Sequence, residues 1–185
     1  MPQPDTFHAV FVSVLAAVLM PAVAMAQTQA PVPPSGTASV CAAVDTAIAA
    51  PWQGWATPEL LPGGTSLGTA GKLAVGHSYR AVLPASSATT YFVPLYKPAA
   101  ADTFAGLFTL TIGTAGTYSI ALGEGAWIDV APEAGKALSS VSHGHGPDCT
   151  TIHKVVDFAL QPGVYVVQVS AAPASPVVIA VAPKS

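Results

Sequence analysis

Three of the five histidines lie within eleven residues of one another, beside one carboxylate and one of only two cysteines. The segment reads Ser-His-Gly-His-Gly-Pro-Asp-Cys from Ser142 to Cys149, and His153 follows it. In extended backbone, residues two apart point to the same face, so the imidazoles of His143 and His145 can converge. Imidazoles with a carboxylate suit zinc or copper, and two histidines with one carboxylate suit ferrous iron. The segment therefore predicts a metal site formed by His143, His145, Asp148 and His153.

The same residue types also form ordinary turns, and this alternative stays open. Glycine adopts positive φ, proline fixes φ, and aspartate hydrogen-bonds the backbone of a turn. The histidines would then bond loop carbonyls or act as a pH-dependent contact. A Ser142–His143–Asp148 triad is disfavoured, because adjacent residues on a strand point to opposite faces. No phosphate-binding glycine loop or Cys-x-x-Cys motif is present in the sequence.

The N-terminal segment has the pattern of an export signal. Residues 11–23 are apolar but too few to span a bilayer, which takes about 20 residues. Ala24-Met25-Ala26 fits a signal-peptidase site, although no Lys or Arg precedes the apolar run. We expect a signal peptide over 1–26, a flexible Pro-, Ala- and Thr-rich linker over 27–38, and a single domain over 39–185. The mature protein would be periplasmic or extracellular.

The two cysteines, Cys41 and Cys149, form an even pair in a chain expected to be exported. In an oxidising compartment such a pair predicts a disulfide bond. This bond would tie the N-terminal region to the histidine segment. The competing interpretation makes Cys149 a thiolate metal ligand or a nucleophile.

Composition excludes some classes of partner. The net charge is −3, with six basic and nine acidic residues, so no basic field would attract a nucleic acid. After the signal peptide no apolar run is long enough to span a membrane. The expected partner is a small molecule, a glycan or a protein.

Hydrophobic alternation from residue 72 onward predicts an all-β fold. Turn signals recur about every 8–12 residues, as in an antiparallel β-sandwich of jelly-roll-like topology. One short N-terminal helix is expected over 39–50, and strands are expected over 73–83, 89–93, 107–112, 117–122, 126–130, 155–160, 163–170 and 176–182. The sequences around Tyr118 and Tyr165 resemble each other. In each, a Gly-x-Tyr turn joins two predicted strands, which predicts two similar hairpins.

Aromatic residues indicate a second kind of site. Trp52 and Trp55 are close enough in sequence to form a platform on which a sugar stacks, although aromatic residues beside Pro and Gly also cap core edges. Trp127 and Asp129 share a strand face, and Asp129 is either a neighbour of the histidine segment or a solvated strand residue.

Two resemblances add to these observations. The Thr114-Ala-Gly-Thr-Tyr118 turn is similar to turns in the pre-peptidase C-terminal jelly-roll domains of secreted bacterial peptidases, which implies a non-catalytic module. Residues 52–55, 123–130 and 143–149 resemble small exported alphaproteobacterial proteins that carry the name homogentisate 1,2-dioxygenase. That name implies iron held by two histidines and one carboxylate in a much longer cupin-type enzyme. Only the 143–153 segment here matches that chemistry.

Function is therefore expected in one of three forms. The first is an exported, non-enzymatic binding or accessory module whose binding loop is 143–153. The second is a small metal-dependent, oxygenase-like enzyme with zinc, copper or iron at that loop. The third is a carbohydrate-binding module that uses Trp52 and Trp55. No residue is assigned a catalytic role.

Overall fold

The computed structural model describes residues 45, 48 and 51–184. The predicted signal peptide, the linker and Cys41 lie outside the described residues, as does most of the predicted helix over 39–50. Those predictions remain predictions. Within the described part of the chain, no helix is long and apolar enough to cross a membrane.

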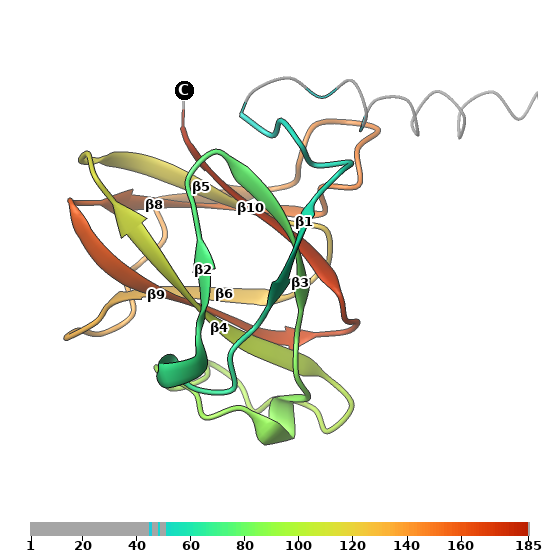
Figure 1. Ribbon diagram of the computed structural model, residues 1–185, viewed down its shortest axis with the longest axis vertical. Coiled ribbons are helices and arrows are strands. Elements are labelled where there is room, and N and C mark those ends of the chain that lie inside the picture. The colour runs from blue at the N-terminus through green and yellow to red at the C-terminus, as the bar shows by residue number, and fades with distance from the viewer. Residues whose placement is uncertain (1–44, 46–47, 49–50, 185) are drawn as a thin grey trace, which may run out of the picture. The chain divides into compact units, whose positions relative to one another are not determined.

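The described residues form two β-sheets that face each other, which confirms the all-β sandwich (Figure 1). The six-stranded sheet has the order β1 (Glu59–Pro62), β3 (His77–Val82), β10 (Val177–Pro183), β5 (Gly116–Leu122), β8 (Lys154–Leu160) and β7 (Ser142–Gly144). The four-stranded sheet has the order β2 (Gly71–Leu73), β4 (Phe104–Ile112), β9 (Gly163–Ala172) and β6 (Trp127–Pro132). Two short 3-10 turns, η1 (Leu67–Thr69) and η2 (Ser86–Ala88), lie between strands. Most strand pairs are antiparallel, but β1–β3 and β2–β4 are parallel, so both sheets are mixed.

The two predicted hairpins are wrong, because each turn joins strands of opposite sheets. Strand β4 belongs to the four-stranded sheet and β5 to the six-stranded sheet, and the same holds for β9 and β8. Strand β4 instead pairs with β9, and β5 pairs with β8. The repeated sequence pattern is therefore a repeated connection across the sandwich.

The tyrosine of each repeat closes its connection. The Tyr118 hydroxyl donates to the Thr114 carbonyl at 2.8 Å, and the Tyr165 hydroxyl donates to the Gln161 carbonyl at 3.0 Å. Both rings are buried in the core. This is the arrangement of a tyrosine corner, in which a buried ring bonds backbone four residues upstream as the chain changes sheets. The internal repeat therefore encodes two such corners.

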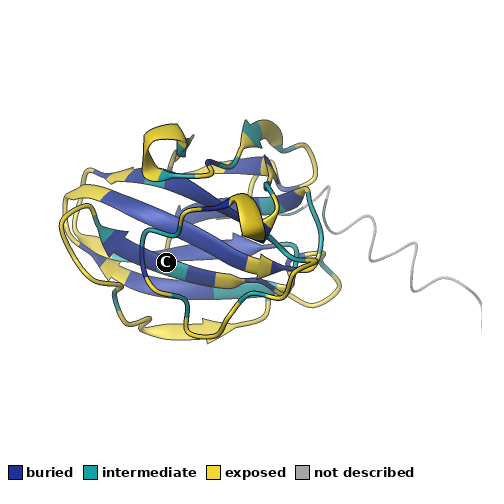
Figure 2. Ribbon diagram, turned by 90° about the horizontal axis from the view of Figure 1, so that it is seen from below, coloured by how far each residue is buried: buried dark blue, intermediate teal, exposed yellow. Residues whose placement is uncertain are grey.

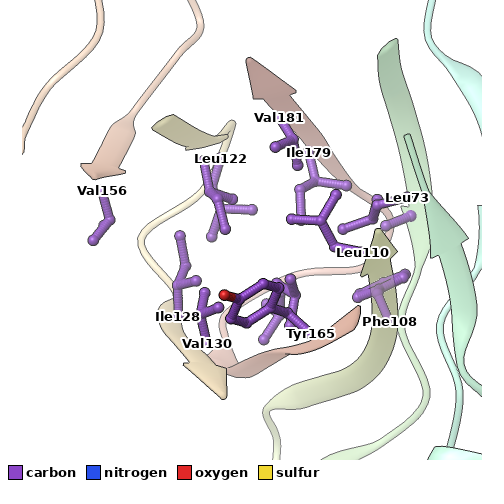
Figure 3. Close-up of a cluster of buried hydrophobic side chains, with 14 of the residues drawn as sticks. Leu73, Phe108, Leu110, Leu122, Ile128, Val130, Val156, Tyr165, Ile179 and Val181 are labelled. Atoms are coloured by element: carbon purple, nitrogen blue, oxygen red, sulfur yellow. The ribbon is translucent and has the colours of Figure 1, made fainter. Parts of the chain in front are cut away.

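The main core lies between the two sheets. Alternate residues of β5 (Tyr118, Ile120 and Leu122) belong to it, as do Leu110 and Tyr165 of the four-stranded sheet. Figure 3 shows side chains from both sheets directed toward one another. The strands are mostly buried and the connecting loops mostly exposed (Figure 2). Period-two alternation therefore identified which residues face inward, as expected for half-buried strands.

Two strand predictions differ from the structure. The predicted 73–83 strand is divided at Gly76, whose φ of +83° turns the chain from β2 in one sheet to β3 in the other. The predicted 89–93 strand is a loop, because its backbone bonds the side chain of Gln168 instead of a neighbouring strand. The Phe92 and Val93 amides donate to Gln168 Oε1, and Gln168 Nε2 donates to the Val93 carbonyl.

Candidate functional site

The histidine segment begins on β7, an exposed edge strand of the six-stranded sheet. His143 lies opposite Val156 of β8, and all three residues of β7 are exposed. The chain then turns back, so His153 lies just before β8. This return brings His153 close to His145.

His145 and His153 are in contact within this loop. The Nδ1–H of His145 donates to the backbone carbonyl of His153 at 2.9 Å. The two rings are nearly perpendicular, at 89°, with their centroids 5.9 Å apart. Because a carbonyl only accepts, the proton of neutral His145 lies on Nδ1, and Nε2 keeps its lone pair.

The predicted four-residue metal site is not assembled in the part of the chain that the structure describes. No group of three or more His, Cys, Asp or Glu side chains lies close enough there to hold a metal ion. Catalytic zinc sites and two-histidine, one-carboxylate iron sites each require three protein ligands. Asp148 is an exposed side chain of the loop.

The loop is held to the domain by two other residues. Both the backbone amide and the hydroxyl of Thr151 donate to the carboxylate of Asp45, at 3.0 and 2.6 Å. The indole N–H of Trp55 donates to the Thr151 hydroxyl at 2.9 Å. A Cβ added at Gly146 would lie 2.4 Å from the Cβ of Ile152, so only glycine permits this close approach. The histidine loop is therefore an anchored structure.

The expectation of a sugar platform at Trp52 and Trp55 is corrected. These side chains are 7% and 2% exposed, so neither presents a ring face to a ligand. They pack on the outer face of the six-stranded sheet against small residues of β5 and β10, namely Ala121, Ala180 and Ala182. Alanine at these positions leaves room for two indole rings, and burial of large apolar surface stabilises the packing.

A different pair of aromatic side chains is exposed. Trp127, at the start of β6, is 43% exposed, and Tyr96, in the loop before β4, is 75% exposed. Their rings are stacked at an interplanar angle of 8° with centroids 5.4 Å apart. We call these residues, together with Asp129 and Lys154, the Trp127 surface.

The polar groups of the Trp127 surface hold its indole in place. Trp127 Nε1 donates to Asp129 Oδ1 at 3.0 Å, and Gln168 Nε2 donates to Asp129 Oδ2 at 3.3 Å. Lys154 Nζ donates to the Ala126 carbonyl at 2.9 Å and lies 5.2 Å from the centre of the Trp127 ring. Such a cation over an indole face is attracted by the ring quadrupole.

Burial perturbs both charged groups of this surface. Partial burial raises the pKa of Asp129, although hydrogen bonds from Trp127 and Gln168 and the charge of Lys154 oppose the shift. Partial burial lowers the pKa of Lys154, and the negative charge of Asp129 opposes that shift. Desolvation therefore dominates at both groups, as at many ligand sites.

Three hollows border Trp127. One, of about 450 Å³, lies between β6 and β8 and is also lined by Asp129, Ser139, Ser140, His143 and Lys154. A second, of about 360 Å³, is lined by His143, His145, His153 and Lys154. The third, of about 340 Å³, lies on the Tyr96 side and is mostly apolar. Trp127 therefore lines both the hollow beside Tyr96 and the hollow beside the histidine loop.

Sequence reasoning identified part of this site. It placed Trp127 and Asp129 on one strand face, and their hydrogen bond confirms that placement. It missed Tyr96 and Lys154, which come from a loop and from the opposite sheet. No local pattern links these residues to Trp127.

No protein-family model and no curated protein matches this chain. Among solved structures, the chain is similar to the pre-peptidase C-terminal domain of a collagenase from Bacillus anthracis. The two share 14% sequence identity at a TM-score of 0.37, over 60% of this chain and 91% of that chain.

Proposed function

We propose that the protein is a ligand-binding module and that the Trp127 surface is its binding site. The observation that carries the proposal is the exposed, stacked Tyr96–Trp127 pair, which three hollows border. Exposed large aromatic groups beside concave surface and a few polar side chains are typical of binding sites. Neither Tyr96 nor Trp127 has its ring in the main core.

The site is held in one arrangement before any ligand arrives. Trp127 stands on a β-strand, its indole is bonded to Asp129, and Asp129 is bonded to Gln168. Gln168 is 1% exposed and also makes three hydrogen bonds to the 92–93 backbone. A preorganised site loses little conformational entropy on binding, which favours affinity.

The predicted binding loop over 143–153 contributes the rim of this site. His143 lines two of the three hollows, and His145 and His153 line one. The loop thus belongs to the same surface as Trp127. No observation in the structure specifically favours the oxygenase-like alternative, so binding is the function that we propose.

The proposal is tested with a panel of soluble ligands measured by thermal shift and ligand-observed NMR. The panel contains oligosaccharides, unstructured peptides and small aromatic compounds. We expect at least one class to bind the wild-type protein and not the Trp127→Ala variant. Leu60→Ala removes another exposed apolar side chain, 71% exposed on β1, and serves as the control that should still bind. Binding that survives Trp127→Ala, or no binding by any class, would contradict the proposal.

Export and a Cys41–Cys149 disulfide are part of the same proposal. Asp45, four residues after Cys41, accepts two hydrogen bonds from Thr151, two residues after Cys149. This contact supports the pairing of the two cysteines, because each cysteine is only a few residues away in sequence from one of the two hydrogen-bonded residues, Asp45 and Thr151. Thiol titration of protein denatured without reductant is expected to detect no free cysteine. Two titratable thiols would refute the bond.

A further inference from the structure

We propose that the Trp127 surface binds a β-linked oligosaccharide of gluco configuration, with one sugar ring packed on the aromatic pair and its neighbours in the adjoining hollows. This inference rests on the proposed function and adds the chemical class of the ligand. It is carried by the geometry of the rings, by the polar groups around them and by the shape of the surface.

The aromatic pair suits the face of a sugar ring. A pyranose whose hydroxyl groups are all equatorial exposes C–H bonds on both faces, and these carry partial positive charge. The face of an aromatic ring is negative, so the two surfaces attract each other. The two rings stack on each other, Lys154 Nζ lies over the Trp127 ring and Lys97 Nζ lies over the Tyr96 ring. Tyr96 is still 75% exposed, the most of any large apolar side chain of the described residues, so its ring offers the sugar a surface.

The polar groups around the rings suit hydroxyl groups. A hydroxyl both donates and accepts, and this surface offers both kinds of partner. Each carboxylate oxygen of Asp129 takes one hydrogen bond from the protein and keeps further accepting capacity, while Lys154 Nζ has donors beyond the one given to Ala126. Lys97 Nζ lies 5.9 Å from the centre of the Tyr96 ring, so an ammonium donor is present beside each aromatic ring.

The shape of the surface suits a chain of sugars. The hollow lined by Asp129 and the hollow lined by His145 share Trp127, His143 and Lys154, and the Tyr96-side hollow also shares Trp127. A ligand that crosses Trp127 can therefore occupy hollows on more than one side. All three are only partly enclosed, so an elongated ligand can extend out of each one.

An extended peptide is disfavoured as the occupant. Such a peptide would add a strand to β6, the outer strand of the four-stranded sheet, by bonding its free backbone groups. Two of the carbonyls at this edge are already engaged. The Val130 carbonyl accepts from the Leu138 amide at 2.7 Å, and the Ala126 carbonyl accepts from Lys154. Covering an edge in this way prevents strand addition.

The test is a calorimetric titration of the purified protein with cellohexaose, chitohexaose and a β-1,4-linked galactose hexamer. The ring substituents of the first two are all equatorial, whereas O4 of galactose is axial, so the glycosidic bond it carries leaves from one ring face. We expect cellohexaose or chitohexaose to bind more tightly than the galactose hexamer. Trp127→Ala and Tyr96→Ala should each weaken that binding by about tenfold or more. Trp127→Phe keeps a ring and should give an intermediate loss, while Leu60→Ala should bind like the wild type.

Each outcome decides the inference. If no oligosaccharide binds, or if Trp127→Ala and Trp127→Phe bind as tightly as the wild type, the saccharide is refuted. If a peptide or small aromatic compound binds through Trp127 instead, the inference of a saccharide ligand is refuted and the proposed binding site is supported. If no ligand of the wider panel binds, both the proposed binding function and the inference of a saccharide ligand are refuted. The thermal midpoint of each variant establishes that it is folded.

Discussion

Replacing Trp55 by alanine is expected to lower the free energy of unfolding by about 3–5 kcal/mol, the usual cost of removing a large buried aromatic side chain. Trp55 is 2% exposed and packs against alanine residues of β5 and β10. The substitution leaves a cavity on the outer face of the six-stranded sheet and removes the hydrogen bond to Thr151. Urea unfolding at neutral pH, followed by circular dichroism, measures the loss.

The same substitution should also loosen the histidine loop. Thr151 would keep Asp45 as a partner but would lose the indole donor. Hydrogen exchange over residues 145–153 is therefore expected to accelerate more than exchange in β4 or β9. Trp55→Phe keeps a ring in the cavity and should lose less stability than Trp55→Ala. A Trp55→Ala protein with wild-type stability and lost ligand binding would restore the idea of a sugar platform at this position.

Replacing Asp157 by alanine is expected to cost about 1–3 kcal/mol near neutral pH, the range for losing hydrogen bonds to a charged group. Asp157 is buried on β8, and its carboxylate accepts from Ser119, Ser142 and Lys184. These contacts join β5, β7, β8 and the end of β10. Lys184 is 46% exposed and returns to water in the variant, so its ion pair adds little to the loss.

The effect of Asp157 should depend on pH. Burial alone would raise its pKa, but hydrogen bonds from Lys184, Ser119 and Ser142 and the charge of Lys184 outweigh burial, so the pKa lies below its usual value of 3.8. The unfolded state then binds the proton more readily than the folded state. Stability from this carboxylate is complete above the unfolded pKa and is lost as pH falls through the lower folded pKa.

Urea unfolding of wild type and Asp157→Ala between pH 7 and pH 2 measures this dependence. The gap between the two proteins should be widest at neutral pH and should shrink below about pH 4, where the unfolded-state carboxyl becomes protonated. Asp102→Ala removes an exposed carboxylate and serves as the control, with little change in stability expected. A gap that grows on acidification would contradict the assigned role of Asp157.

Most strand positions could be predicted because the alternation of apolar and polar residues that marks a strand lies within that strand's own sequence. Predicted segments overlap the strands around Leu110, Ile120, Val156, Val167 and Ile179. Strands β1 and β7 were missed, since they are short and largely exposed and so carry little alternation. The 89–93 segment was misassigned because its β-like residues bond a buried glutamine side chain, which no local pattern reveals.

The sequence by itself determined where the chain alternates between buried and exposed residues, and hence that the protein is a β-sandwich. It also determined the two repeated tyrosine turns. Only the tertiary structure decided which sheet each strand joins and which tryptophans are exposed. Trp55 and Trp127 both stand beside small residues in the sequence, yet Trp55 lies over alanines of β5 and β10 whereas Trp127 lies on an outer strand beside Tyr96. Burial and the meeting of distant side chains depend on packing between strands far apart in the chain, so local patterns do not contain them.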